Sequence, residues 1–463
     1  MNKKEDDKMK FDESVLREAD IRGKYPEQLN SEFAMRLGKV FGTYVRKEKS
    51  DYCVVGHDNR FGGPDLTKNL IEGLLSTGVN VIYIGLVTTP MLNYASRRLG
   101  VDYGVCVTAS HNPKNDNGFK LFGKYALHCS HKDLDYIYEA LKNPDFKFKK
   151  GDGDLKHIDV SDAYAEAVAE STIPGKKNLK VVVDPGNGTG SVIVKKVYDK
   201  LPYKVTYIND KSDPSFPNHH PDPNVKDNLK QLQAAVKKNK ADIGLAYDGD
   251  ADRIGVVDNK GNVVDSDVMM ALMVGSILRD YPDKPILIDV KCTKTLQDEI
   301  EKHHGKFIEV TPSSARQEDQ MFFDDLAFGG GYSNHIFFHD RHPGYDDGIY
   351  AGLRFHEMLS YSKYSLSDML KSLKTYYNTD EIKVATTDEK KWKIVESIKK
   401  YCDNNEYEYD TIDGVKAHLK NGWALVRASN TGPNLTLRFE ATTAARLAAI
   451  KKEFLGMVEM LNK

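Results

Sequence analysis

The chain has 463 residues, of which 40% are apolar and 29% are charged. This composition excludes a wholly disordered protein and allows about three or four domains. The 66 Lys and Arg residues nearly balance the 68 Asp and Glu residues, and the net charge is −2. Because this balance provides no broad basic surface, we expect no nucleic acid partner.

The five cysteines are scattered, and no two of them form a CxxC pair. A sparse, odd set of this kind indicates reduced thiols rather than a disulfide framework. The opening residues carry charges where a signal peptide would need an apolar run. The longest apolar stretch, Val268–Leu278, is shorter than the ~20 residues that span a bilayer. We therefore predict a soluble, cytoplasmic protein with no membrane partner.

Helix-like and strand-like segments alternate along about the first 370 residues. Apolar residues from Phe33 to Tyr44 recur at helical spacing after Ser31, which we expect to be the N-cap, and a further helix is expected at Thr293–His303. This alternation predicts an α/β protein with parallel sheets that helices cover on both faces. Ligands of such sheets bind at the carboxyl ends of strands, in loops that lead to helices. Short β-branched runs predict strands at Cys53–Gly56, Val79–Ile84, Gly104–Thr108, Lys180–Asp184, Ile243–Ala246 and Ile286–Val290.

Three segments are candidate domain boundaries. The stretch 147–156 is charged and rich in glycine, as linkers often are. Two further boundaries are expected near Asp258–Gly261 and Tyr377–Glu381. No short internal repeat is present, although three similar α/β units could be related beyond the reach of one sequence.

The first candidate for chemistry is the segment Thr108-Ala-Ser-His-Asn-Pro113, which follows the third expected strand. Ser110 would lie at the carboxyl end of that strand, with His111 beside it. A serine hydroxyl is a weak nucleophile unless a base or a metal activates it. Taken alone, the segment could equally be a turn rich in Ser and Asn that Pro113 closes.

The second candidate is Asp248-Gly-Asp-Ala-Asp-Arg253, which follows the expected strand Ile243–Ala246. Three carboxylates on alternate residues repel one another unless a divalent cation neutralises them. An EF-hand is excluded, because position 6 counted from Asp248 is Arg253 rather than Gly and position 12 is Asn259 rather than Glu. Three carboxylates leave room for water or a phosphate oxygen in an octahedral shell, which favours Mg²⁺ over a solvated acidic turn.

The third candidate is Arg427-Ala-Ser-Asn-Thr-Gly-Pro433, followed by Arg438. Its guanidinium, hydroxyl, amide and turn N–H groups form an anion cradle, although alone it could be an ordinary turn. Gly186–Gly190 (GNGTG) lacks the Lys of a P-loop and the spacing of a dinucleotide fingerprint, so we predict a tight strand-to-helix turn there. A nucleophile, a cation site and a remote phosphate cradle together favour phosphoryl transfer.

These motifs, in this order, resemble the α-D-phosphohexomutase family, and most of all its bacterial phosphomannomutase/phosphoglucomutase type. TASHNP is similar to the family's phosphoserine loop, DGDADR to its metal loop and RASNTGP to its phosphate-binding loop. The likeness runs nearly end to end, with supporting segments at Ala19–Gly23 (ADIRG), Gly56–Arg60 (GHDNR), Gly85–Pro90 (GLVTTP), Asn117–Lys120 (NGFK), Phe216–Pro223 (FPNHHPDP) and Gly344–Arg354 (GYDDGIYAGLR).

The resemblance implies three related α/β domains plus a smaller C-terminal α+β domain around a central cleft. It also implies transfer of phosphate between C6 and C1 of mannose or glucose phosphate, through a phosphoserine and a bisphosphosugar that turns over in the cleft. Mg²⁺ and an activating bisphosphosugar, such as glucose 1,6-bisphosphate, would be the cofactors, and the protein would be a monomer or a weak homo-oligomer. The expected domains are 1–155 (phosphoserine), 156–258 (metal), 259–375 (sugar) and 376–463 (phosphate).

The resemblance also assigns roles to residues. Ser110 would carry the transferred phosphate, whose charge near neutral pH is about −1.5 to −2. Ser110 would also bind Mg²⁺ together with Asp248, Asp250 and Asp252. The residues that would aid proton transfer and stabilise charge are Lys120, Arg253 and His111. The substrate-binding residues would be Arg22 at the reacting phosphate, Ser333 and His335 at the sugar, and Arg427, Ser429, Asn430 and Thr431 at the other phosphate.

One region departs from the family pattern. The sugar-selecting loop usually reads Gly-Glu-x-Ser-Gly-His, whereas Gly330–His335 reads GGYSNH, so that Gly331 replaces the carboxylate that would bind sugar hydroxyls. Upstream, a Thr-Gly-His-Ser stretch appears as Thr311–Ser314 without its His. We expect the loss of this acceptor to open space, which Tyr332 or Asn334 could fill in part, and to weaken or shift selectivity among hexose phosphates.

Two alternatives to a hexose phosphate mutase remain open. One is a mutase for a pentose or amino sugar phosphate, and the other is a phosphosugar-binding or regulatory protein without turnover. Retention of Ser110 and of all three aspartates disfavours the second, since a protein without turnover need not keep them. A phosphoserine hydrolase is disfavoured because it would gain nothing from a grip on a distal phosphate.

Overall fold

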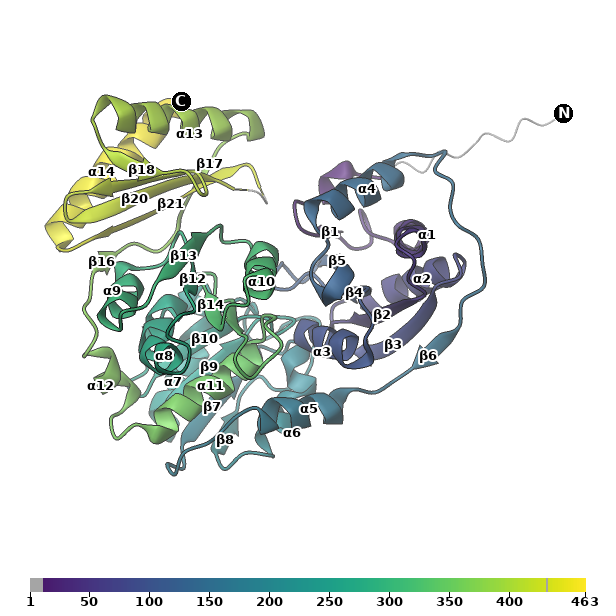
Figure 1. The fold of residues 1–463 in the computed structure, drawn as a ribbon, viewed down its shortest axis with the longest axis horizontal. Helices are drawn as coiled ribbons and strands as arrows, with labels where there is room; N and C mark the ends of the chain where they lie inside the picture. The colour runs from purple at the N-terminus through teal and green to yellow at the C-terminus, as the bar shows by residue number, and fades with distance from the viewer. Residues whose placement is uncertain (1–10, 430–431) are drawn as a thin grey trace. The chain divides into compact units, whose positions relative to one another are not determined.

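The computed structural model describes residues 11–429 and 432–463, which fall into two units (Figure 1). The first unit runs to Val263 and also includes Tyr345–Tyr361, whereas the second contains Val264–Gly344 and Ser362–Lys463. The four domain boundaries expected from the sequence stay a prediction. Within the described ranges, no helix is both long enough and apolar enough to cross a membrane.

The first sheet of the first unit is mixed rather than wholly parallel, which corrects the sequence-based expectation. β2 is parallel to β3 and β4, but β5 is antiparallel to both β4 and β1. The segment 108–115 between β4 and β5 is too short for a crossover helix, so these two strands pair antiparallel. The spatial order is β1 (Ile21–Lys24), β5 (Asp116–Phe122), β4 (Gly104–Val107), β2 (Tyr52–His57), β3 (Asn80–Leu86) and β6 (Leu155–His157).

Helices cover both faces of this sheet (Figure 1). Cys53 and Val55 of β2 belong to one core cluster with Phe41 and Leu70, whereas Val54 is equally buried and points to the opposite face. The covering helices are α1 (Ser31–Lys47), α2 (Gly63–Leu75), α3 (Thr89–Leu99) and α4 (His131–Lys142), and short 3₁₀ helices lie at Glu13–Val15 and Lys124–Ala126.

Helix α1 begins at Ser31, the residue predicted to be its cap, and so starts one residue earlier than expected. Asn30, not Ser31, is the N-cap, and its side chain accepts a hydrogen bond of 3.0 Å from the backbone N–H of Phe33. Ser31 is the first helical residue, and its hydroxyl donates to Asp65 Oδ2 of α2 at 2.7 Å. Both residues are good caps, and the one that precedes the helical backbone takes the role.

The second sheet of the first unit is also mixed. β7 is parallel to β8 and β9, whereas β10 is antiparallel to β9. The order is β11 (Val263–Val264), β10 (Ile254–Asp258), β9 (Ile243–Tyr247), β7 (Lys180–Asp184) and β8 (Lys204–Tyr207). Its helices are α5 (Ser161–Glu170), α6 (Val194–Tyr198), α7 (Lys230–Asn239) and α11 (Gly348–Tyr361), with 3₁₀ helices at Thr189–Val192 and Lys226–Leu229.

The second unit contains one mixed and one antiparallel sheet. In the mixed sheet the order is β13 (Phe307–Val310), β12 (Ile286–Asp289), β14 (Phe328–Gly330) and β15 (Ile336–Phe338), with α8 (Ser266–Asp280), α9 (Lys294–Lys302), α10 (Ser314–Phe323) and α12 (Leu366–Leu370). The antiparallel sheet runs β16 (Tyr377–Asn378), β21 (Asn434–Ala441), β20 (Gly422–Ala428), β19 (Val415–Leu419) and β18 (Glu408–Asp410), and β17 (Ile382–Ala385) also pairs with β21. Helices α13 (Asp388–Asn404) and α14 (Ala444–Leu461) pack on it. These sheets confirm the predicted fold class.

The candidate loops share one topological position. Each follows the carboxyl end of a strand, but the next element is an antiparallel strand rather than a helix. The expectation that they lead into helices is therefore wrong. The connections are 108–115 between β4 and β5, 248–253 between β9 and β10, 331–335 between β14 and β15, and 429–433 between β20 and β21.

Candidate active site

Ser110 lies in a left-handed backbone conformation, with φ of 51°, at the end of β4. A residue other than glycine adopts this conformation only when its surroundings hold it. Arg60, which is almost fully buried, donates hydrogen bonds to the carbonyl oxygens of Ser110 at 2.5 Å and Asn112 at 2.6 Å. It also donates to the carbonyls of Pro113 and Asp116, so one guanidinium fixes the whole loop.

Two further side chains hold the same loop. Thr108 Oγ1 accepts the backbone N–H of Ser110 at 2.9 Å and donates to Asp58 Oδ2 at 2.6 Å. Arg22 Nη1 donates to Asn112 Oδ1 at 2.7 Å. Arg22 is therefore in contact with the serine loop, and its role at the reacting phosphate stays a prediction.

The Ser110 hydroxyl donates to Asp248 Oδ2 at 2.7 Å and lies 3.2 Å from Nδ1 of His111. The two loops that carry these side chains touch at Gly249, where a Cβ would lie 2.4 Å from the carbonyl oxygen of Ser110. Only glycine allows this approach without a shift of the backbone. The candidate nucleophile thus lies directly beside the acidic loop.

Asp248, Asp250 and Asp252 are all buried, and one carboxylate oxygen from each lies within 4.8 Å of the others. Asp250 Oδ1 is buried and accepts no hydrogen bond from the residues that the structure describes. Because carboxylate oxygens are the preferred ligands of hard divalent cations, these residues fit a bound Mg²⁺. The acidic loop is therefore a candidate metal site.

Lys120 of β5 compensates part of this negative charge. Its Nζ donates to Asp250 Oδ2 at 2.8 Å and to Asp252 Oδ2 at 2.5 Å. Burial acts to lower the pKa of Lys120, but the two aspartates outweigh it, and the pKa lies well above its usual value. Burial and Asp252 act to raise the pKa of Asp250, yet Lys120 outweighs them and that pKa is lowered. Lys120 and Asp250 are therefore a charged pair in the protein interior.

Asp248 differs from Asp250, because among the described residues no side-chain cation donates a hydrogen bond to its carboxylate. Burial, followed by the charges of Asp252 and Asp250, raises the pKa of Asp248 well above its usual value. Arg253, whose backbone N–H donates to Asp248 Oδ1 at 3.2 Å, has its Nε 4.0 Å from Asp252 Oδ1. The predicted catalytic residues Ser110, His111, Lys120 and Arg253 thus border one acidic loop.

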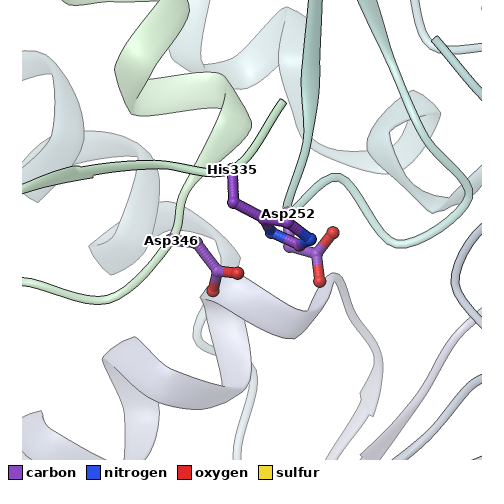
Figure 2. A group of neighbouring side chains, drawn as sticks. All are labelled: Asp252, His335 and Asp346. Atoms are coloured by element: carbon purple, nitrogen blue, oxygen red, sulfur yellow. The ribbon is translucent and has the colours of Figure 1, made fainter. Parts of the chain in front are cut away.

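Asp346 is a member of this site that the sequence patterns did not single out. It is buried directly before α11, and its charge helps to raise the pKa of Lys120. Figure 2 shows the carboxylates of Asp252 and Asp346, which come from the acidic loop and from the segment before α11. The backbone N–H of Gly348 donates to the carbonyl of Ala251 at 3.1 Å, which fixes the start of α11 against the loop. The two adjacent aspartates in the segment GYDDGIY are the sequence feature that could have indicated Asp346.

The glycine-rich segment after β7 is a turn, as predicted, and it enters the 3₁₀ helix Thr189–Val192. Thr189 Oγ1 accepts the backbone N–H of Asn59 at 3.0 Å, and the Asn59 side chain donates to the carbonyl of Asn187 at 2.7 Å. The turn therefore connects the two sheets of the first unit by hydrogen bonds. It fixes Asn59, and with it the adjacent residue Arg60.

In the second unit, residues 331–335, which are predicted to select the sugar and are called the sugar-selecting loop, lie between β14 and β15, and His335, also labelled in Figure 2, is buried at the end of this loop. Ser333 Oγ accepts a hydrogen bond of 2.7 Å from Lys291 Nζ. The space beside Gly331 is not open, because a Cβ there would lie 2.0 Å from Asp289 Oδ2. This corrects the expectation that the missing side chain leaves room in the site.

The phosphate loop is described except for Asn430 and Thr431, two predicted ligands that lie outside the described residues. Arg427 Nε donates to Asp413 Oδ2 at 2.6 Å. The buried Lys391 donates to the carbonyl of Ser429 at 2.8 Å and to that of Gly432 at 3.3 Å, so it clamps both ends of the loop. The pattern of the sequence did not indicate Lys391.

Arg438, which the sequence placed beside the anion cradle, has a structural role. It is fully buried in β21, 3.5 Å from Asp267 Oδ2, and its guanidinium carbon lies 3.5 Å from the centroid of the Tyr332 ring. Its cation is thus already paired with a carboxylate and stacked on an aromatic face.

Comparison with known proteins identifies the family to which this architecture belongs. The sequence matches the family descriptions "Phosphoglucomutase/phosphomannomutase, alpha/beta/alpha domain" I at residues 13–148, II at 162–261 and III at 265–377, and the C-terminal domain at 381–457. The fold and the sequence therefore define a phosphohexomutase. The chain belongs to the phosphoglucomutase/phosphomannomutase family.

Its relatives match over nearly their whole length. A phosphomannomutase/phosphoglucomutase of Pseudomonas syringae is 38% identical over 96% of this chain and 94% of the relative. A phosphoglucomutase of Neisseria gonorrhoeae is 33% identical over 96% of both chains. The crystal structure of a family protein from Burkholderia thailandensis has a TM-score of 0.90 at 32% identity and covers 98% of both chains. An N-acetylglucosamine-phosphate mutase at 15% identity and a TM-score of 0.66 shares the fold.

Proposed function

We propose that this phosphohexomutase moves a phosphoryl group between C6 and C1 of a glucose or mannose phosphate, with Ser110 as the phosphate carrier. The observation that carries the proposal is the hydrogen bond of 2.7 Å between Ser110 Oγ and Asp248 within a cluster of three aspartates. Relatives named phosphomannomutase/phosphoglucomutase and phosphoglucomutase support the choice of sugar.

In the proposed reaction, phosphoserine 110 donates its phosphoryl group to the free C1 or C6 hydroxyl of the bound sugar phosphate. The bond from phosphorus to the serine oxygen breaks, a bond to the sugar oxygen forms, and the sugar proton passes to a nearby base. The bisphosphosugar then turns over, and its other phosphate returns to Ser110. Phosphate number is conserved, so a bisphosphosugar such as glucose 1,6-bisphosphate would phosphorylate and activate resting enzyme.

Residues around Ser110 would divide this work. His111, whose Nδ1 lies 3.2 Å from Ser110 Oγ, would accept or return a proton. Lys120 and Arg253 would stabilise charge on the transferring group, and Arg22 would approach the same phosphate. The residues that would bind Mg²⁺ are Asp248, Asp250 and Asp252, joined by the Ser110 phosphate. When bound there, the cation would neutralise phosphate charge.

The second unit would bind the rest of the substrate. Arg427 and Ser429, together with Asn430 and Thr431, would hold the phosphate that does not react, and Ser333 and His335 would contact the sugar. A mutase for another sugar, such as a pentose or amino sugar phosphate, is the second candidate. The observation in its favour is Gly331, which has no side chain to bind a sugar hydroxyl, while Asp289 occupies the space where a Cβ would lie.

A coupled assay over glucose, mannose, glucosamine and ribose 1-phosphates, with glucose 1,6-bisphosphate and Mg²⁺ present, tests the proposal. We expect turnover of glucose or mannose 1-phosphate and its loss in Ser110→Ala. Efficient turnover of only the amino sugar or pentose phosphate would establish the second candidate. Absence of turnover on every sugar would overturn both.

A further inference from the structure

The sugar-selecting loop has no carboxylate of its own that could reach a sugar. Gly331 stands where the family pattern has Glu. Its neighbour Asp289 is fully buried, and both of its oxygens already accept backbone N–H groups, Oδ1 from Lys291 at 2.7 Å and Oδ2 from Tyr332 at 3.0 Å. Both oxygens of Asp289 are therefore engaged by the backbone, and a carboxylate acceptor for sugar hydroxyls would come from another segment.

Glu381, directly before β17, brings a carboxylate to this loop. Lys291 Nζ donates to Ser333 Oγ at 2.7 Å and to Glu381 Oε1 at 2.8 Å, so Ser333 and Glu381 share one ammonium group. The Glu381 side chain is 27% exposed. Among the described residues its Oε2 accepts no hydrogen bond. One oxygen thus anchors the carboxylate and the other is available to a ligand.

The charge around Glu381 suits recognition of a phosphosugar. Burial acts to raise the pKa of Glu381, but Lys291 and, after it, Arg427 outweigh burial and hold that pKa below its usual value. The carboxylate is therefore ionised near neutral pH, between the sugar loop and the Arg427 side of the phosphate loop. An ionised carboxylate accepts stronger hydrogen bonds from hydroxyls than a neutral acceptor does.

We propose that Glu381 supplies the sugar-hydroxyl acceptor that Gly331 lacks, and so determines which hexose phosphates are substrates. This inference rests on the proposed mutase function. The competing explanation is that Glu381 only ties β17 to Lys291 within the second unit. The two explanations differ in one respect: a hydroxyl acceptor matters only for sugars that carry the hydroxyl, whereas a structural tie affects all sugars alike.

The test combines variants of Glu381 with sugars that lack single hydroxyls. Wild type and Glu381→Ala are assayed for kcat/KM on glucose 1-phosphate and on its 2-, 3- and 4-deoxy analogues. We expect Glu381→Ala to lower kcat/KM on glucose 1-phosphate about 10- to 100-fold, the size of one lost charge-assisted hydrogen bond. On the analogue that lacks the recognised hydroxyl, kcat/KM of Glu381→Ala should be at most about 3-fold below that of wild type, because this analogue cannot make the contact in wild type either.

Glu381→Gln keeps the shape and one hydrogen-bonding oxygen, and serves as the second variant if Glu381→Ala does not fold. It should show the same dependence on the hydroxyl with a smaller loss. Glu389→Ala removes an exposed carboxylate from the first turn of α13 and is the matched control, for which we expect no change. An equal loss on parent and deoxy sugars, or no loss at all, overturns the inference while the mutase function stands. If wild type turns over no hexose phosphate, the proposed function itself fails.

Discussion

Ser110 Oγ and Asp248 Oδ2 are 2.7 Å apart, so the hydroxyl expected to carry phosphate is bonded to the acidic loop itself. A phosphate on this oxygen would add a charge of about −1.5 to −2 beside three carboxylates. Lys120 offsets only part of that charge, because it is already paired with Asp250 and Asp252. Phosphorylation of Ser110 and cation binding should therefore depend on each other.

The first prediction is that Ser110 carries phosphate in a fraction of the purified protein, and that the fraction rises on incubation with glucose 1,6-bisphosphate and Mg²⁺. Peptide mass spectrometry with and without chelator measures it. Ser110→Ala should lack both the phosphate and mutase activity. Phosphate found only at another residue, with full activity in Ser110→Ala, would show that the nucleophile assignment is wrong.

The second prediction separates two aspartates of the acidic loop. Asp248→Asn and Asp250→Asn should both abolish turnover, since each removes a candidate Mg²⁺ ligand. Their effects on stability should differ. Asp250 is bonded to the buried Lys120 cation, and its loss should cost about 2 kcal/mol or more. From the part of the chain that the structure describes, Asp248 accepts only a neutral hydroxyl and a backbone N–H, so Asp248→Asn should cost about 1 kcal/mol or less.

Thermal melting in chelator measures this difference in stability. The sequence alone does not predict this difference, because the ion pair between Asp250 and Lys120 joins segments 130 positions apart. Turnover that is unaltered in chelator would contradict the metal assignment for both variants.

The third prediction concerns Arg60, a positioning residue for the serine loop. Arg60→Lys keeps a cation beside Asp58 but cannot reach the carbonyls of Ser110, Asn112 and Pro113 together. We expect kcat to fall about 10-fold or more while KM for the phosphosugar changes little, since the phosphate loop is untouched. Reduced phosphorylation of Ser110 should accompany the fall. A rise in KM with unchanged kcat would indicate a role in substrate binding instead.

The fourth prediction tests the phosphate loop. Arg427→Ala should weaken binding of a hexose phosphate about 10-fold or more, the worth of one charge-assisted hydrogen bond to a phosphate dianion. Isothermal calorimetry on dephosphorylated protein measures the affinity without turnover. The control is Lys451→Ala, which removes an exposed cation from α14, a helix that packs on the same antiparallel sheet as Arg427. Normal binding by Arg427→Ala would mean that the loop is only a turn.

Linear motifs were recovered from the sequence, whereas partners from distant segments were not. Ser110 and the three aspartates could be proposed from the sequence because each motif is contiguous. Three carboxylates on alternate residues repel one another unless a cation neutralises them, and a serine that directly follows a strand is a candidate nucleophile. Arg60 holds a serine 50 positions away, and Glu381 reaches a lysine 90 positions away. No periodicity or spacing encodes such contacts, which depend on how the strands pair.

Strand direction escaped prediction for a related reason. β5 begins with Asp116 and Asn117 and lacks the β-branched run that marked the other strands. Because this run is missing, the sequence does not mark β5 as a strand, and the remaining strands predict a parallel sheet. The polar start of β5 instead holds neighbouring loops, since Asp116 Oδ2 accepts a hydrogen bond from Asn112 at 3.0 Å and the Asn117 side chain donates to the carbonyl of Phe61 at 2.9 Å.

The last prediction concerns His356 of α11, which is fully buried against Tyr198 and Tyr203. Neither ring nitrogen has a hydrogen-bond partner among the described residues, and burial lowers the pKa of His356 to about 3. The folded protein therefore holds His356 neutral, while the unfolded chain protonates it below about pH 6.5. Because the unfolded state binds the extra proton, stability should fall as pH drops from about 6.5 towards 3.

Between about pH 7 and pH 5 this single histidine should cost the fold about 2 kcal/mol. His356→Phe removes the titrating group, keeps a planar ring in the tyrosine cluster, and should make the melting temperature less sensitive to pH over this range. His304→Asn removes an exposed histidine, at a left-handed backbone position that asparagine tolerates, and should leave the pH sensitivity unchanged. Equal pH sensitivity of wild type and His356→Phe would show that His356 is protonated as readily in the fold as in the unfolded chain.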